Sequence, residues 1–131
     1  MTMRVFAAAM AAILALGAGA AARAQSDADD PYLTPAFKAC LRAERSTVGI
    51  IECQVAERGR QDALMQAAYR ARLAPLTGAD RGVLAADQAA WSARTSAACD
   101  VWRRRPGPWS SVRAQGCLID DTIARRIALA R

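Results

Sequence analysis

The sequence predicts an all-α fold: a small antiparallel helical hairpin or bundle of three to four helices, stapled by two disulfides. Apolar residues recur three or four positions apart along the long stretches of the chain, which is the spacing of helices that bury one face. No stretch shows the alternation of apolar and polar residues that indicates a strand. The 131 residues include four cysteines, an even number that suits two disulfides in a small domain.

The first 24 residues have the pattern of a secretory signal peptide. Arg4 supplies a positive charge, residues 5–22 are apolar or small, and Ala22-Arg23-Ala24 is a small-x-small cleavage site. We expect cleavage after Ala24, and an uncleaved membrane anchor is the alternative. No cysteine directly follows the cleavage site, so a lipid anchor is not expected. The mature protein is predicted to be periplasmic or secreted, and not to span a membrane.

The mature chain is small and basic. Removal of residues 1–24 leaves 107 residues, enough for one domain with a modest core. It removes two arginines and no acidic residue, so the formal net charge falls from +6 to +4. Such a charge favours anionic partners, such as lipid head groups and acidic glycans. Nucleic acid would fit the charge too, but it is not expected as a partner because the chain is exported.

A polar and acidic stretch bounded by prolines follows the signal peptide. We expect this stretch, residues 25–35, to be a flexible N-terminal segment. The helical domain is then predicted to cover residues 36–131, and its first helix is short, over 36–43.

A long helix is expected next, over about 48–76. Its apolar positions keep helical spacing except around 57–60, where Gly59 is a candidate for a kink. Pro75 and Gly78 are expected to end this helix, because neither residue favours a continued helix.

Two further helices are predicted in the second half of the chain. Thr77 and Asp80 have the spacing of a helix cap with an acidic first turn, and this helix is expected to reach about residue 104. Pro106-Gly107-Pro108 should then open a loop that lasts to Gly116. The last helix is expected over about 118–130, and its arginine-rich end suits a helix C-terminus.

The four cysteines are Cys40, Cys53, Cys99 and Cys117. Three pairings are possible, and we favour Cys40–Cys53 with Cys99–Cys117 because the members of each pair are close in sequence. Crossed pairings remain open. Each favoured bridge would stabilise the fold by about 3 kcal/mol in the chain-entropy description. The cysteine spacing does not match a zinc site and the chain has no histidine, so no metal ion or other cofactor is expected.

Three ordered blocks of residues stand out from this pattern. They read Asp62-x-x-Met65-Gln66-x-x-Tyr69, then Leu84-x-x-x-Gln88-x-x-Trp91 with Cys99 eight residues later, then Cys117-x-x-x-x-Thr122-x-x-Arg125-x-x-x-Leu129. With the upstream cysteine pair, these blocks resemble the domain of the LprI-type lysozyme inhibitor family over residues 37–129. The resemblance implies a small exported helical domain that inhibits lysozyme.

The residues of these blocks are expected to serve the fold. The aromatic members should pack their rings, and the tyrosine should also bond through its hydroxyl. Gln88 and Thr122 lie on otherwise buried faces, so each is expected to form a hydrogen bond between helices. Arg125 needs an acidic partner, and Asp62 and Asp87 are the two candidates.

The sharpest candidate for binding is a basic and aromatic segment at the end of the third predicted helix. Arginine forks bind phosphate and carboxylate, and tryptophan suits interfaces and sugar rings. The alternative is a solvated basic helix end that the helix dipole favours. The candidate residues are Trp102, Arg103, Arg104, Arg105 and Trp109.

An enzyme is not expected, because the chain has no histidine to act as general base and no nucleophile with an activating partner. The first functional hypothesis is an exported binding protein that inhibits a lysozyme or another cell-wall hydrolase, with loop 106–116 in the active cleft. Many lysozymes are cationic, so a protein of charge +4 would meet repulsion. The alternative is an envelope-binding or structural module that contacts anionic lipid, lipopolysaccharide or glycan.

Overall fold

The computed structural model describes residues 30–131, in which Pro31–Arg131 form one unit. The predicted signal peptide, and residues 25–29 of the segment expected to be flexible, lie outside the described residues. The described chain contains four α-helices and no strand: α2 (Pro35–Ala43), α3 (Thr47–Leu73), α4 (Gly78–Arg103) and α5 (Ser110–Leu129). The predicted all-α fold is confirmed. None of these helices has the length and apolar character needed to cross a membrane.

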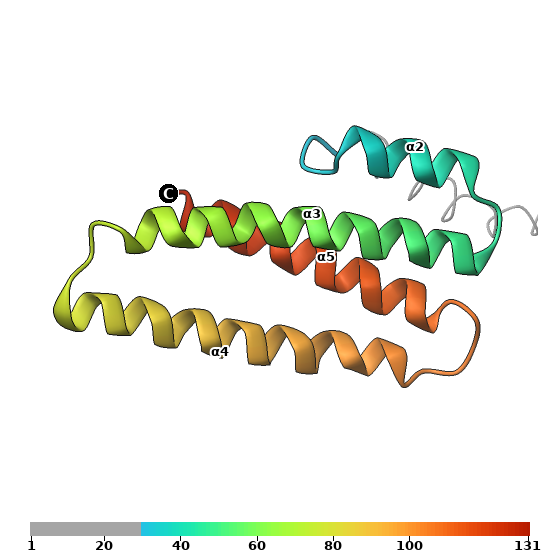
Figure 1. The fold of residues 1–131 in the computed structure, drawn as a ribbon. Helices are drawn as coiled ribbons and strands as arrows, with labels where there is room; N and C mark the ends of the chain where they lie inside the picture. The colour runs from blue at the N-terminus through green and yellow to red at the C-terminus, as the bar shows by residue number, and fades with distance from the viewer. Residues whose placement is uncertain (1–29) are drawn as a thin grey trace, which may run out of the picture. The chain divides into compact units, whose positions relative to one another are not determined.

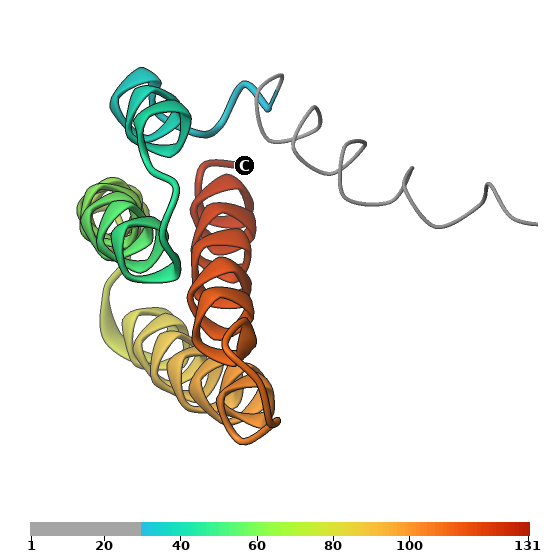
Figure 2. The ribbon, with the colours of Figure 1, turned by 90° about the vertical axis from the view of Figure 1, so that its right-hand side faces the viewer.

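The three long helices form the hairpin and its packed third helix, and α2 lies along the first half of α3 (Figure 1). α4 runs antiparallel to α3, and α5 runs antiparallel to α4. Seen from the end, α5 lies beside both α3 and α4 (Figure 2), and its contacts with these two helices are the most extensive in the domain. α5 is therefore the element that holds the hairpin together.

Both favoured disulfides are present. Cys40–Cys53 joins α2 to α3, and Cys99–Cys117 joins α4 to α5. Each bridge therefore ties two helices that follow one another in the chain. The core cluster that contains the first bridge draws on the segment before α2 and on α2, α3 and α5; its buried members are Leu33, Phe37, Cys53, Ile119 and Ile123.

Side chains at the helix starts explain where α2 and α3 begin. Thr34 and Ser46 are the N-caps, and their hydroxyls accept hydrogen bonds from the backbone N–H groups of Phe37 and Gly49. α3 runs without interruption through Gly59 and ends at Leu73, three residues before the expected end.

The loop expected over residues 106–116 is much shorter than predicted, because α5 begins at Ser110. Pro106-Gly107-Pro108 predicted a loop that lasts to Gly116, but long-range contacts maintain helix over the serines and the glycine from Ser110 onward. Ala114 is buried, and the side-chain amide of Gln54 on α3 donates to the Val112 carbonyl at 3.1 Å. Burial against α3 thus outweighs the weak helix preference of these residues.

The end of the segment expected to be flexible is packed against the domain. Leu33 is buried in the core cluster, and Pro35 is already the first residue of α2. The segment 31–34 therefore forms part of the described domain.

Candidate binding surface

The turn between α4 and α5, residues 104–109, carries most of the predicted binding residues. Pro106 and Pro108 restrict their own φ angles, and Gly107 between them has a φ of +105°, which a residue with a side chain rarely adopts. The Ser110 N–H donates to the Gly107 carbonyl at 3.3 Å. The Cys99–Cys117 bridge joins the two helices on either side. The local sequence therefore favours one conformation of this turn.

The four predicted residues of the helix end differ in their contacts. Arg103 and Arg104 both pair with Asp100, at 3.5 and 3.0 Å. Arg105 instead places its guanidinium carbon 4.6 Å from the centroid of the Trp102 ring. Asp100 thus offsets part of the charge of the first two arginines, whereas Arg105 makes a cation–π contact.

A further arginine, which the sequence did not single out, completes this arrangement. Arg113, in the first turns of α5, lies over the same Trp102 ring with its guanidinium carbon 5.6 Å from the centroid. It is eleven positions from Trp102 in a different helix, so helical spacing offered no signal for it. Trp102 itself is partly buried, which lets it hold both side chains in place.

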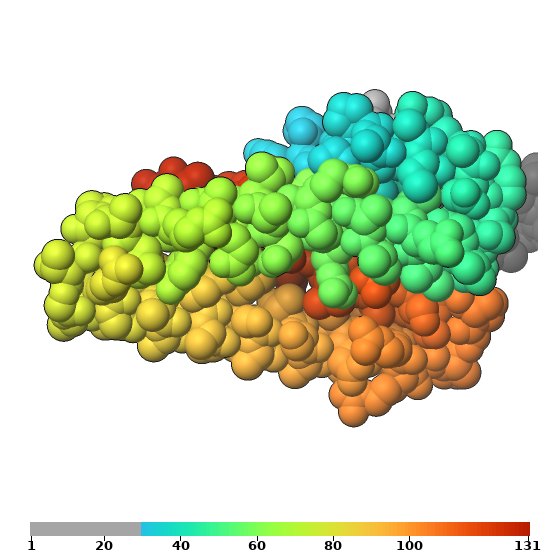
Figure 3. All heavy atoms as spheres, in the orientation of Figure 1, coloured from blue at the N-terminus to red at the C-terminus, as the bar shows by residue number. Residues whose placement is uncertain are grey.

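Trp109 is the large aromatic residue that this turn presents to solvent. Its exposed fraction is 52 %. It lines a surface pocket of about 470 Å³ together with the proline pair, Gly107, Ser110, Arg105 and Arg113. In Figure 3 the turn, drawn in orange, projects at the end of the hairpin. An exposed tryptophan on a constrained projecting turn is typical of a contact residue for a partner.

Several residues of the three blocks converge where α3, α4 and α5 meet. Arg125 on α5 donates to the Gln88 amide oxygen at 2.8 Å and to the Asp87 carboxylate at 2.7 Å. The Gln88 amide nitrogen lies 3.2 Å from the sulfur of buried Met65 on α3. Arg125 also lies over the ring of partly buried Trp91, 5.7 Å from its centroid. Gln88 therefore makes the expected bond between helices, and Asp87 is the acidic partner of Arg125.

Three other block residues differ from their expected contacts. The Thr122 hydroxyl donates to the Leu118 carbonyl of its own helix at 2.7 Å, so its bond is not between helices. The hydroxyl of Tyr69 forms no hydrogen bond within residues 30–131, although the ring is partly buried. Asp62 is exposed and forms no ion pair or hydrogen bond within residues 30–131. Its candidate partner Arg125 instead pairs with Asp87 on α4.

A family match covers most of the described domain. The model of the family described as lysozyme inhibitor LprI matches residues 39–129. The chain belongs to the LprI family. No curated protein and no solved structure matches it. The LprI family is a family of lysozyme inhibitors. The Asp87–Gln88–Arg125 cluster lies inside the matched range, so it forms part of the LprI domain.

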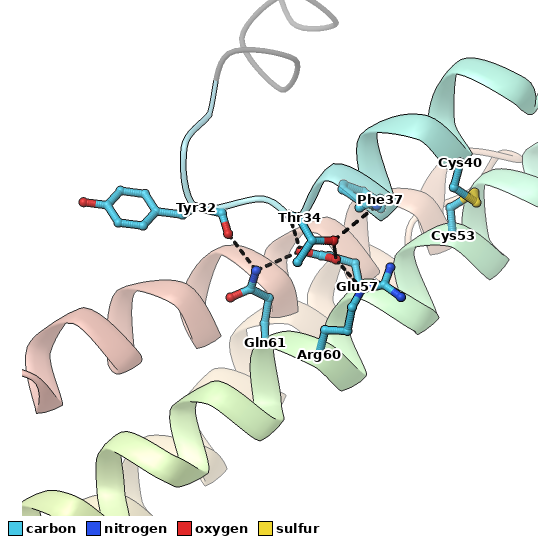
Figure 4. Close-up of polar contacts among 8 residues, drawn as sticks. All are labelled: Tyr32, Thr34, Phe37, Cys40, Cys53, Glu57, Arg60 and Gln61. Atoms are coloured by element: carbon cyan, nitrogen blue, oxygen red, sulfur yellow. Dashed lines mark hydrogen bonds and ion pairs between the residues drawn. A yellow bond between two sulfur atoms is a disulfide. The ribbon is translucent and has the colours of Figure 1, made fainter.

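The LprI domain of this chain also contains a buried carboxylate that the sequence did not indicate (Figure 4). Glu57, in the middle of α3, has an exposed fraction of 0 %. Its oxygens accept from the Thr34 N–H at 3.0 Å and the Thr34 hydroxyl at 2.5 Å, and from Gln61 and Arg60 at 2.8 and 2.9 Å. Gln61 also donates to the Tyr32 carbonyl at 2.7 Å. These bonds attach the segment before α2 to α3.

Burial and hydrogen bonding act in opposite directions on Glu57. Burial alone would raise the pKa of this carboxyl group, because it disfavours the charged form. The hydrogen bonds from Thr34, Gln61 and Arg60 favour the charged form, and they hold the pKa of Glu57 below its ordinary value of 4.5. Glu57 is thus ionised at neutral pH, and its charge strengthens the hydrogen bonds that attach the segment before α2 to α3.

One group of side chains in the described chain has the composition of a metal site. The sulfurs of Cys99 and Cys117 and a carboxylate oxygen of Asp121 lie within 4.8 Å of one another. The two sulfurs are bonded to each other, so they are not available as thiolate ligands. A metal ion would have only one carboxylate here, which does not fit a metal centre.

Proposed function

We propose that this protein is an exported, non-enzymatic binding protein that inhibits a lysozyme or another cell-wall hydrolase through the α4–α5 turn. The single observation that carries the choice of surface is the exposed Trp109 on a turn constrained by two prolines. Membership of the LprI family supports a lysozyme as the partner. The signal-peptide pattern supports a periplasmic or secreted location, the compartment in which a lysozyme would contact this protein.

The constraint on the turn favours binding. A flexible loop loses conformational entropy when it enters a cleft, and a turn fixed in advance loses less. Pro106, Pro108 and the Cys99–Cys117 bridge each limit the conformations of this turn before a partner arrives. The aromatic ring of Trp109 can then contribute apolar contact area with few torsions to restrict.

Local charge offsets the repulsion that the net charge would cause. The mature chain carries +4, and many lysozymes are cationic as well, which slows association at long range. The active clefts of glycoside hydrolases, however, contain a pair of carboxyl groups. A turn that carries arginines suits such a cleft, because a guanidinium group forms paired hydrogen bonds with a carboxylate.

Inhibition of lysozyme by the oxidised mature chain, residues 25–131, tests the proposal. Several lysozyme types are titrated at two salt concentrations, and stoichiometric inhibition of at least one is expected. Trp109→Ala should weaken inhibition by about 30-fold, the effect of losing an interface hot spot. Val83→Ala is the control, because Val83 is 68 % exposed but lies near the far end of α4.

The outcomes test two claims separately: that the protein inhibits a lysozyme, and that the α4–α5 turn is the surface that contacts it. If no lysozyme is inhibited, a lysozyme is not the partner and that part of the proposed function fails. If inhibition occurs and Trp109→Ala inhibits as well as Val83→Ala, the function stands and the turn is not its contact surface.

Adhesion to an anionic envelope component is the second candidate, and the basic turn is the observation that favours it. Lipid, lipopolysaccharide or glycan would be held by the arginines beside Trp102 and Trp109. Salt distinguishes the candidates. Adhesion to an anionic surface should weaken steeply as ionic strength rises, whereas inhibition of a cationic enzyme should be preserved because salt screens the repulsion.

A further inference from the structure

Two arginines at the α4–α5 turn both contact the Trp102 ring, and neither has an acidic partner among residues 30–131. The guanidinium carbons of Arg105 and Arg113 lie 4.6 and 5.6 Å from the centroid of the Trp102 ring. Within residues 30–131 neither forms an ion pair, whereas Arg103 and Arg104 share Asp100. The ring therefore holds two positive charges, and no carboxylate of the described chain forms an ion pair with either of them.

The position of Arg113 makes this arrangement more unusual. The N-terminal end of a helix has a partial positive charge, so it favours anions and disfavours cations. α5 begins with no acidic residue in its first turn and with no side-chain hydrogen bond from its N-cap, Trp109. An arginine here opposes the helix dipole, and a bound anion would compensate both the dipole and the two arginines.

The space for such an anion is already formed. Arg105 and Arg113 line the pocket of about 470 Å³ at the turn, together with Ser110, the first residue of α5. Trp102 does not line the pocket but holds both guanidinium groups beside it through cation–π contacts. The arginines are thus positioned by the fold before any ligand binds.

We propose that Arg105 and Arg113 form a binding site for a carboxylate group, and that this group is an acidic side chain of the inhibited hydrolase. The second part rests on the proposed function. A carboxylate presents two oxygens in a plane, which matches the fork of donors on an arginine. The site then gives the turn two components: Trp109 supplies apolar contact and the arginine pair supplies charge recognition.

The first test uses the oxidised protein alone, with acetate as the probe. Binding is followed by NMR through the side-chain Nε–H signals of the arginines. Acetate should shift the signals of Arg105 and Arg113 in a saturable manner. Arg105→Gln or Arg113→Gln should abolish saturation, while Arg104→Gln should preserve it, because Arg104 is already paired with Asp100 at 3.0 Å. All three variants remove one charge from the same region, which controls for net charge.

The second test measures inhibition by the same variants. Arg105→Gln and Arg113→Gln should each weaken inhibition about tenfold, the value of one charged hydrogen-bonded contact, and Arg104→Gln should have a much smaller effect. Arg113→Lys should restore part of the loss, because it retains the charge but not the planar fork. Thermal unfolding of each variant confirms that the exposed substitutions leave the fold intact.

The combined outcomes separate this site from the proposed function. Saturable acetate shifts at both arginines without inhibition of any lysozyme would support the anion site and refute a lysozyme as the source of the carboxylate. Strong inhibition that Arg105→Gln and Arg113→Gln leave unchanged would overturn the site while the function stands. If these variants reduce binding only to phosphatidylglycerol vesicles, the ligand is a lipid phosphate and the carboxylate assignment is wrong.

Discussion

Replacing Thr34 by valine tests whether the buried carboxylate of Glu57 holds the segment before α2 in place. Valine preserves the shape and β-branching of threonine but lacks its hydroxyl. In the structure that hydroxyl donates to the Glu57 carboxylate at 2.5 Å and accepts from the Phe37 N–H at 3.2 Å. Thr34→Val therefore removes two contacts, one to a charged group and one at the start of α2.

The expected cost follows from these two contacts. Loss of an N-cap lowers the free energy of unfolding by about 1 kcal/mol. Loss of a hydrogen bond to a charged group costs about 2 kcal/mol more, since Glu57 remains buried and is left with fewer donors. Thr34→Val should therefore lower the free energy of unfolding by about 3 kcal/mol at pH 7, measured by urea unfolding with the disulfides intact.

The pH dependence gives a second readout. The pKa of Glu57 is lowered in the folded protein, so its ionised form stabilises the fold above the ordinary value of 4.5. This contribution is lost as the pH falls through the pKa of the folded state. Thr34→Val should raise that pKa, because it removes a donor to the charged form. The difference in stability between the two proteins should therefore narrow as the pH is lowered from neutral.

Ser46→Ala is the matched control. Ser46 caps α3 by accepting from the Gly49 N–H at 3.0 Å. Its loss should cost only about 1 kcal/mol, with no change in pH dependence. If Thr34→Val costs no more than Ser46→Ala, and its cost is the same at neutral and acidic pH, the reasoning about Glu57 is refuted.

Two other predictions concern the bridges and the cluster at α4 and α5. Replacing both cysteines of the α4–α5 disulfide by serine should lower the free energy of unfolding by about 3 kcal/mol and weaken inhibition. The same change in the α2–α3 disulfide should cost as much stability without affecting inhibition; equal effects on inhibition would contradict a turn fixed in advance. In a double-mutant cycle by urea unfolding, Asp87→Asn should cost about 0.5 kcal/mol, because Asp87 is 51 % exposed. Arg125→Met should cost about 2 kcal/mol, because it leaves the partly buried Gln88 without its donor, and equal costs would refute this difference.

The sequence predicted those features of the fold that depend on local pattern. Apolar spacing identified four helices, and closeness along the chain identified both disulfides. The same reasoning failed where a distant contact decides the structure. The stretch before Cys117 was expected to be a loop, because the burial of Ala114 and the bond from Gln54 to the Val112 carbonyl lie outside any local window.

The Glu57 network was missed for a related reason. A charged residue at a buried position interrupts the apolar pattern, so residues 57–60 looked like a break in the helix. Its main partner, Thr34, lies 23 positions earlier, in a stretch whose composition suggests flexibility. No spacing rule connects the two. The partner on the same helix, Gln61, has the i,i+4 spacing of many exposed side-chain pairs, so it did not indicate burial.

Two arginines of α5 show how stability and binding are divided in this domain. Arg125, near the C-terminal end of the helix, is only 12 % exposed. Its guanidinium group forms an ion pair with Asp87 and donates a hydrogen bond to the Gln88 amide oxygen. Arg113, near the N-terminal end, is exposed, opposes the helix dipole and has no carboxylate partner within residues 30–131. Replacing the first should therefore reduce stability. Replacing the second should leave stability unchanged or raise it, because it removes an unfavourable charge, and should weaken only the binding that makes this charge useful.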